Sequence, residues 1–146
     1  MSALFTLDAS VFTSVCNRRE EGSAASAALL AAIRAHALPL LEPALLPIEV
    51  AAAVRRGCGD ETLAREYAEA LMDLPHLTLV PVETDLCREA VRLAAKCSLR
   101  GADAVYVATA ERYGAVLVTL DFEQRQRAPQ AVQACTPRDA LRLVKR

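Results

Sequence analysis

Two short apolar runs decide the fold, and each ends on an aspartate: Phe5-Thr6-Leu7-Asp8 and Ala115-Val116-Leu117-Val118-Thr119-Leu120-Asp121. Each run has the length and composition of a buried strand. If both strands lie in one parallel sheet, their C-terminal ends share an edge, and open α/β sheets bind ligands at that edge. The two runs therefore predict a pair of carboxylates at a functional edge.

Strand and helix signals alternate along the rest of the chain. Ser23 is expected to cap an alanine-rich helix, and Pro47 suits the first turn of another helix, which Gly57 and Gly59 end. The expected strands are 4–8, 38–43, 77–82, 115–120 and 131–135; the expected helices are 10–17, 23–37, 48–56, 60–73, 85–100, 102–113 and 137–146, with a turn or short helix at 122–127. This alternation predicts one α/β domain over residues 1–146, with three layers and a mostly parallel central sheet flanked by helices.

Composition limits the classes of protein to which the chain can belong. Hydrophobic residues make up 53% of it, yet no apolar run reaches the roughly 20 residues that span a bilayer. The first residues lack the basic segment of a signal peptide. We expect a cytoplasmic protein that does not contact a membrane. The five cysteines are scattered without a C-x-x-C pair, which argues against a disulfide framework or structural zinc and favours small buried thiols.

The net charge of −1 hides an asymmetry between the two parts of the chain. Residues 1–87 hold 6 basic and 12 acidic side chains, whereas residues 88–146 hold 11 and 6. Arg88, Arg92 and Lys96 recur every four residues, so they would form one stripe on a helix. Such a stripe is more often a solvated helix face than a contact for a polyanion.

Two further acids, Glu49 and Asp103, are expected in the first turn of otherwise apolar helices. A carboxylate in that place is favoured simply by the helix dipole. Each neighbourhood is so apolar, however, that the helix should be buried, and a buried carboxylate must be paired, protonated or bound to a metal. Asp8 and Asp121 have their own structural alternative, because each could cap the helix that follows it. Jointly, four acids in such places exceed what capping needs.

Four carboxylates at one edge would repel one another and raise each other's pKa. A hard divalent cation such as Mg²⁺ or Mn²⁺ prefers oxygen ligands and would relieve this repulsion. Such an ion can also lower the pKa of a water molecule and clamp a phosphodiester. The four acids are therefore candidate ligands of a divalent metal site.

The ordered set of motifs resembles a PIN domain, and in particular a VapC-type toxin ribonuclease. Each motif is weak alone, but the set covers essentially the whole chain at family-like spacing. The matching segments are Leu7-Asp8-Ala9-Ser10, Pro47-Ile48-Glu49-Val50, Ala102 to Ala110 and Leu117-Val118-Thr119-Leu120-Asp121. The resemblance implies that the acidic tetrad Asp8, Glu49, Asp103 and Asp121 holds one or two Mg²⁺ or Mn²⁺ ions, with Ser10 and Thr119 as supporting or substrate contacts.

The resemblance further implies a metal-dependent endoribonuclease that cleaves phosphodiester bonds of single-stranded or loop RNA. It implies an RNA substrate, a cognate antitoxin protein as partner and a homodimer, as in a type II toxin–antitoxin pair. Arg88, Arg92 and Lys96 would then be weak candidates for RNA contact. The chain departs from the pattern of a VapC-type ribonuclease in two ways. It lacks a net basic excess, and Glu123 adds an acid that either joins the site or pairs with an arginine.

Three other functions are compatible with parts of the pattern. A catalytically degenerate PIN domain would bind RNA or protein without cleavage, so metal binding and RNA cleavage distinguish it from a nuclease. A phosphotransfer aspartate, as in haloacid-dehalogenase-like phosphatases, would need a second aspartate two residues after Asp8, where Ser10 stands. A Cys–His nucleophile would need His36 or His76, and nothing in the sequence positions either histidine.

Overall fold

A parallel sheet forms the centre of the computed structural model, which describes residues 3–145. Within these residues the sheet has five strands in the order β3-β2-β1-β4-β5, and every pairing is parallel. The strands are β1 (Phe5–Leu7), β2 (Leu40–Pro43), β3 (Leu77–Val80), β4 (Val116–Val118) and β5 (Ala134–Cys135). The chain winds from β1 outward to β3 and then returns to β4 on the other side of β1. The direction of winding therefore reverses between β1 and β4, which makes their shared edge a topological switch point.

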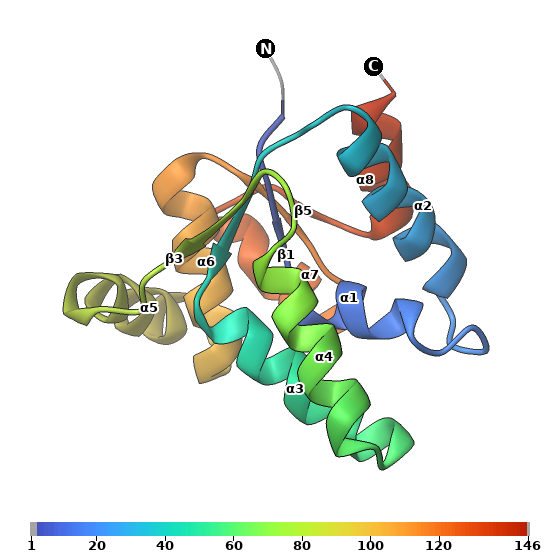
Figure 1. Cartoon of the computed structure of the whole chain (residues 1–146). Coiled ribbons are helices and arrows are strands. Elements are labelled where there is room, and N and C mark those ends of the chain that lie inside the picture. The colour runs from blue at the N-terminus through green and yellow to red at the C-terminus, as the bar shows by residue number, and fades with distance from the viewer. Residues whose placement is uncertain (1–2, 146) are drawn as a thin grey trace.

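Helices cover both faces of this sheet and complete three layers. They are α1 (Ala9–Val15), α2 (Ser23–Ala35), α3 (Leu45–Cys58), α4 (Glu61–Met72), α5 (Thr84–Cys97), α6 (Gly101–Tyr113), α7 (Phe122–Arg127) and α8 (Pro137–Val144), with a 3₁₀ turn at Ala128–Gln130. Figure 1 shows α5 and α6 on one side of the sheet and α2 and α8 on the other. The α3–α4 hairpin extends from the end of the sheet at which β1 and β2 finish (Figure 1).

The core confirms the prediction of an α/β domain with a parallel central sheet. Phe5, Leu7 and Leu117 are fully buried, as expected for strands covered on both faces. The strands are shorter than expected, and the run at 122–127 is a helix, α7. None of the helices formed by residues 3–145 is both long and apolar enough to cross a membrane.

Most cysteines are not buried, so the prediction of small buried thiols is wrong. Cys16, Cys58 and Cys87 are exposed, Cys135 is partly buried and Cys97 is buried. The reason is their position: Cys16 and Cys58 lie at the C-terminal ends of α1 and α3, and Cys87 lies on an outward face of α5. Sequence spacing alone does not reveal which face of a helix a cysteine occupies.

The helix α2 starts differently from the prediction. Gly22, not Ser23, is the N-cap residue, with a φ of 89°, and Ser23 is the first helical residue. This φ lies in the left-handed region that glycine adopts at little cost. A Cβ atom added to Gly22 would lie 2.7 Å from Cδ2 of Leu120, the residue before Asp121. Gly22 is therefore required both by its backbone conformation and by a close approach.

We expect Gly22→Ala to lower the free energy of unfolding by about 1–2 kcal/mol, because alanine pays for the left-handed conformation. Urea denaturation measures this change. Gly57→Ala is the matched control, since Gly57 lies within α3 with nothing within 4 Å of the added Cβ. It should raise the stability by up to about 1 kcal/mol, because alanine is the better helix former. Equal effects of the two substitutions would contradict this account.

Candidate functional site

Asp8 lies at the end of β1, at the switch point of the sheet. Its main-chain N–H donates to the carbonyl oxygen of Val118 in β4 at 2.9 Å, which joins the ends of the two strands. Its side chain is 8% exposed and caps α1, with Oδ2 accepting from the N–H of Ser10 at 3.1 Å. Asp8 is therefore a helix cap and also a buried acid at the edge where such sheets bind ligands.

Asp121 follows β4 and caps α7, because its Oδ1 accepts from the N–H of Gln124 at 3.1 Å. Thr119 connects the two aspartates: its hydroxyl donates to Oδ2 of Asp8 at 3.3 Å and accepts from the N–H of Asp121 at 3.0 Å. Ser10 adds a second connection, since its Oγ accepts from the N–H of Leu120 at 3.1 Å. The capping alternative and the candidate site thus coexist, since the hydrogen bond from Gln124 engages one carboxylate oxygen of Asp121.

The prediction that Glu49 lies in the first turn of its helix is wrong. The helix α3 begins at Leu45, before the expected range 48–56, and Glu49 therefore lies in the second turn. Nor is α3 buried all round, since the side chain of Ile48 is 68% exposed. Asp103 does lie in the first turn of α6, as predicted. Both carboxylates are partly buried.

Neighbouring acids of the tetrad affect the ionisation of Asp8, Glu49 and Asp103. Burial raises the pKa of Asp8, and the charge of Asp121 raises it further, against hydrogen bonds from Ser10 and Thr119 that lower it. Burial raises the pKa of Glu49, to which the charge of Asp8 also contributes. Asp103 is affected by the charges of all three other acids.

Burial and the charges of Asp8 and Asp121 raise the pKa of Asp103 to about 6, while Arg100 opposes the shift. Glu49 contributes a smaller increase. Asp103 thus interacts with all three other acids, and the structure brings the whole predicted tetrad to one edge of the sheet. A strongly perturbed carboxyl group in such a place is typical of functional sites.

The donor set fits a hard divalent cation, because all four side chains offer carboxylate oxygens. Among residues 3–145, however, no three acidic, cysteine or histidine side chains are already arranged to hold an ion. The chemistry of the residues suits a metal, while the fold supplies no preformed cage among the described residues.

Two buried groups at the site were missed by the sequence analysis. Glu42, in β2, is completely buried, and its Oε1 accepts from the N–H of Leu7 at 2.5 Å. Tyr106, in α6, is also completely buried, with its hydroxyl beside Glu49. That hydroxyl forms no hydrogen bond of standard geometry with the described residues. Glu42 had a detectable signal, since an acid between Leu41 and Pro43 interrupts a strand expected to be buried.

Glu123 pairs with arginines. Its carboxylate accepts from Arg100 at 2.7 Å and lies 3.3 Å from the guanidinium of Arg127. Arg127 also donates to the carbonyl oxygen of Ser98 at 2.7 Å. These contacts link α7 to the segment between α5 and α6. Glu123 therefore holds α7, which Asp121 caps, close to the start of α6, which carries Asp103.

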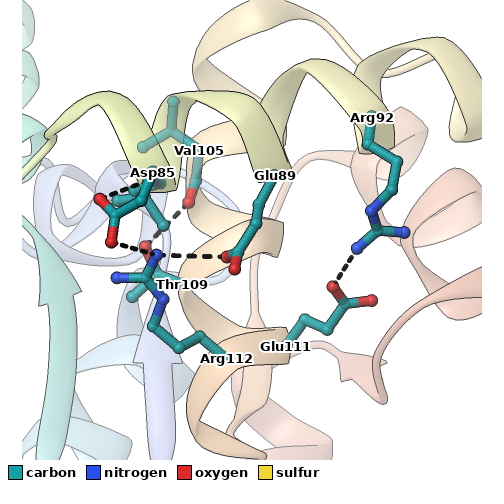
Figure 2. Close-up of polar contacts among 8 residues, drawn as sticks. Asp85, Glu89, Arg92, Val105, Thr109, Glu111 and Arg112 are labelled. Atoms are coloured by element: carbon teal, nitrogen blue, oxygen red, sulfur yellow. Dashed lines mark hydrogen bonds and ion pairs between the residues drawn. The ribbon is translucent and has the colours of Figure 1, made fainter.

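The basic stripe lies on α5, which packs against α6. Figure 2 shows that Arg92 faces α6 and forms an ion pair with Glu111, near the end of α6 opposite to Asp103. In the same interface, Arg112 lies 3.4 Å from both Asp85 and Glu89 (Figure 2). Arg92 therefore contributes to the packing of α5 on α6 and lies away from Asp103. RNA contact by Arg88, Arg92 and Lys96 stays a prediction.

The fold and this edge define an α/β domain with an acidic site at its topological switch point. The model of the PIN domain family matches residues 5–128. The chain therefore belongs to the PIN domain family, which removes the phosphatase alternative. No curated protein sequence matches the chain closely enough to count as a relative.

Several solved structures share the fold. VapC20 of Mycobacterium tuberculosis, a toxin that cleaves the sarcin–ricin loop, is 17% identical over 84% of this chain and 93% of its own, with a TM-score of 0.69. VapBC2 of Rickettsia felis, bound to a DNA fragment from its promoter, is 11% identical over 91% and 98%, with a TM-score of 0.68. PAE2754 of Pyrobaculum aerophilum is 21% identical over 100% of both chains, with a TM-score of 0.66. At these identities the likeness shows the fold.

Proposed function

We propose that this PIN domain is a metal-dependent endoribonuclease that cleaves single-stranded or loop RNA, as the toxin of a type II toxin–antitoxin pair. The observation that carries the proposal is the grouping of carboxylates at the switch point, where the charges of Asp8, Asp121 and Glu49 help burial to raise the pKa of Asp103 to about 6. Such clustering is costly without a cation and suits phosphodiester chemistry with one. The similarity in fold to VapC20 supports the choice of RNA as substrate.

Asp8, Glu49, Asp103 and Asp121 would hold one or two Mg²⁺ or Mn²⁺ ions. When bound, such an ion supplies a water of lowered pKa and stabilises charge on the phosphoryl oxygens. The ionised tetrad would keep the edge negative until the cation binds. It would therefore exclude RNA phosphates from the metal-free site.

Ser10 and Thr119 would support the site by orienting Asp8. The two hydrogen bonds that Oδ2 of Asp8 accepts come from the Ser10 amide and the Thr119 hydroxyl. Both bonds fix the rotation of the carboxylate, as outer partners of metal ligands generally do. Because the Thr119 hydroxyl also accepts from the Asp121 amide, it would hold the two aspartates in a constant relation.

A cognate antitoxin and a second copy of the chain are the proposed protein partners. Several structures with this fold are complexes, among them a toxin–antitoxin complex from Klebsiella pneumoniae that is 20% identical with a TM-score of 0.64. Co-expression with the product of a neighbouring gene, followed by gel filtration, would test the antitoxin. Light scattering of the purified chain would test the homodimer.

The nuclease proposal is tested by incubating the purified protein with a pool of single-stranded and hairpin RNAs. Mg²⁺, Mn²⁺ and EDTA are compared, with Asp8→Asn alongside. We expect cleavage that requires the metal and is lost in the variant. Cleavage in EDTA, or equal cleavage by Asp8→Asn, would contradict the proposal.

A degenerate PIN domain that binds RNA or protein without cleavage is the second candidate. It is favoured by one observation, the absence of a preformed metal-binding group among residues 3–145. Calorimetric titration with Mn²⁺ separates the two, because a degenerate site would bind the ion weakly or not at all. RNA binding without metal binding would support the degenerate module.

A further inference from the structure

The ends of β1 and β2 separate just before Asp8. The register pairs Phe5 with Leu40 at the start of the two strands, whereas β2 stays paired with β3 along its whole length. Where the next bond from β1 would reach β2, the N–H of Leu7 donates to a side chain, Oε1 of Glu42, at 2.5 Å. The carboxyl group of Glu42 thus occupies the gap between the separated strand ends.

Glu42 is an unusual residue for such a gap. Its side chain is completely buried, and its Oε2 has no hydrogen-bond partner among the described residues. Burial raises the pKa of Glu42 well above its usual range, and the charge of Asp8 raises it further, although the Leu7 amide opposes the shift. An apolar side chain would avoid the orphaned Oε2 but would leave the Leu7 N–H unpaired.

The main chain at Asp8 is held from both neighbouring strands. On the β4 side, the Asp8 N–H donates to Val118. On the β2 side, the preceding amide, that of Leu7, donates to Glu42. The two consecutive amides fix the peptide planes on either side of Leu7, and with them the direction in which the Asp8 side chain leaves the strand.

We propose that Glu42 is a positioning residue: by accepting the Leu7 amide proton inside the gap between β1 and β2, it fixes the main chain that carries Asp8. The effect on cleavage rests on the proposed function, but the effect on the main chain does not. Glu42 touches neither the reacting atoms nor the predicted ion, and it acts through Leu7. The contribution of Glu42 to the position of Asp8 should therefore be lost when residue 42 has no acceptor for the Leu7 amide. Any side chain that keeps such an acceptor should restore it.

Glu42→Met removes the acceptor and keeps much of the volume, whereas Glu42→Gln keeps an oxygen for the Leu7 amide. We expect Glu42→Met to weaken Mn²⁺ binding, measured by calorimetry on the folded protein, by about 10–100-fold. We expect kcat for RNA cleavage to fall while KM is unchanged, because Asp8 and not substrate contact is disturbed. Glu42→Gln should restore both quantities to within about threefold of the wild type. Loss of Mn²⁺ affinity in Glu42→Gln equal to that in Glu42→Met would overturn the proposal.

Thr6→Val is the matched control. The Thr6 hydroxyl donates to the carbonyl oxygen of Leu41 at 2.7 Å, so this variant removes a second cross-strand bond between β1 and β2, two residues before Asp8. It should lower the melting temperature much as Glu42→Met does, with unchanged Mn²⁺ affinity and kcat. If the two variants lose Mn²⁺ affinity equally, the role of Glu42 is merely structural. Should Glu42→Met not fold, Glu42→Asp replaces it, because the shortened side chain draws the acceptor back from Leu7.

Hydrogen exchange at the amides of Asp8 and Ser10 in the metal-free protein separates this inference from the nuclease proposal. Faster exchange in Glu42→Met than in Thr6→Val supports the positioning role even if the wild type neither binds Mn²⁺ nor cleaves RNA. Equal exchange in the two variants overturns it even if the wild type is an active nuclease.

Discussion

Asp103→Asn is expected to lower RNA cleavage by at least about 10³-fold, because each ligand of a catalytic ion contributes to several kcal/mol of transition-state stabilisation. Asp103 is the member of the tetrad whose ionisation depends on all three others. Neutralising it removes negative charge where a cation should bind. The measurement is the single-turnover rate at saturating Mn²⁺.

The same variant should remain folded. Asp139→Asn is its control, since Asp139 lies in α8 and forms an exposed ion pair with Arg142. Exposed pairs of this kind contribute little to stability, about 0–1 kcal/mol. The control should cleave RNA at the wild-type rate. If Asp103→Asn unfolds the protein, or cleaves as fast as the control, Asp103 has a structural role.

The second large effect is on stability, and its sign follows from the raised pKa of Asp103. The folded-state value is about 6, against an ordinary value of 3.8. Between these two pH values the folded protein binds more protons than the unfolded chain, so stability falls as the pH rises from about 4 to about 6. Two pKa units correspond to about 3 kcal/mol, and solvent screening of this half-exposed group reduces the expected loss to about 1–2 kcal/mol.

Urea denaturation of the metal-free protein at pH 4, 5, 6 and 7 measures this loss. The difference between the wild type and Asp103→Asn isolates the contribution of Asp103 from ordinary acid denaturation. The variant should be the more stable protein at pH 7 and should lose this advantage near pH 4. Saturating Mn²⁺ should stabilise the wild type at pH 7 more than the variant, because only the wild type keeps the full donor set. If the difference in free energy of unfolding between the wild type and Asp103→Asn does not change with pH, the pKa of Asp103 is not raised.

The fold could be predicted from the sequence because its signals are local. The runs that end at Asp8 and Asp121 are buried strands, and glycine stops such as Gly59 are read directly from residue type. The order of the strands is not local, and the placement of β4 beside β1 required either the structure or a resemblance. The start of α3 was missed because Ala44 caps it without any side-chain hydrogen bond that a pattern could reveal.

The candidate site was predictable in its members and not in its supports. Asp8, Glu49, Asp103 and Asp121 occupy recognisable motifs, and the structure brings all four to one edge. The supports depend on pairings across the sheet: the partner of Glu42 is an amide 35 residues away. Glu123 likewise required the structure, because Arg100 reaches it from the segment between α5 and α6.

The family match ends at residue 128, but the sheet does not. Beyond that point β5 covers the open side of β4, with the amide of Leu117 donating to Gln133 at 2.9 Å and that of Thr119 donating to Cys135 at 3.1 Å. A fragment cut at the family boundary would leave β4 as a bare edge strand, free to pair with other chains and aggregate. It would also uncover the face of α2 on which α8 packs. Insolubility of such a fragment would therefore carry no information about the acidic site. It would reflect the loss of β5, which protects the edge of β4 in the whole chain.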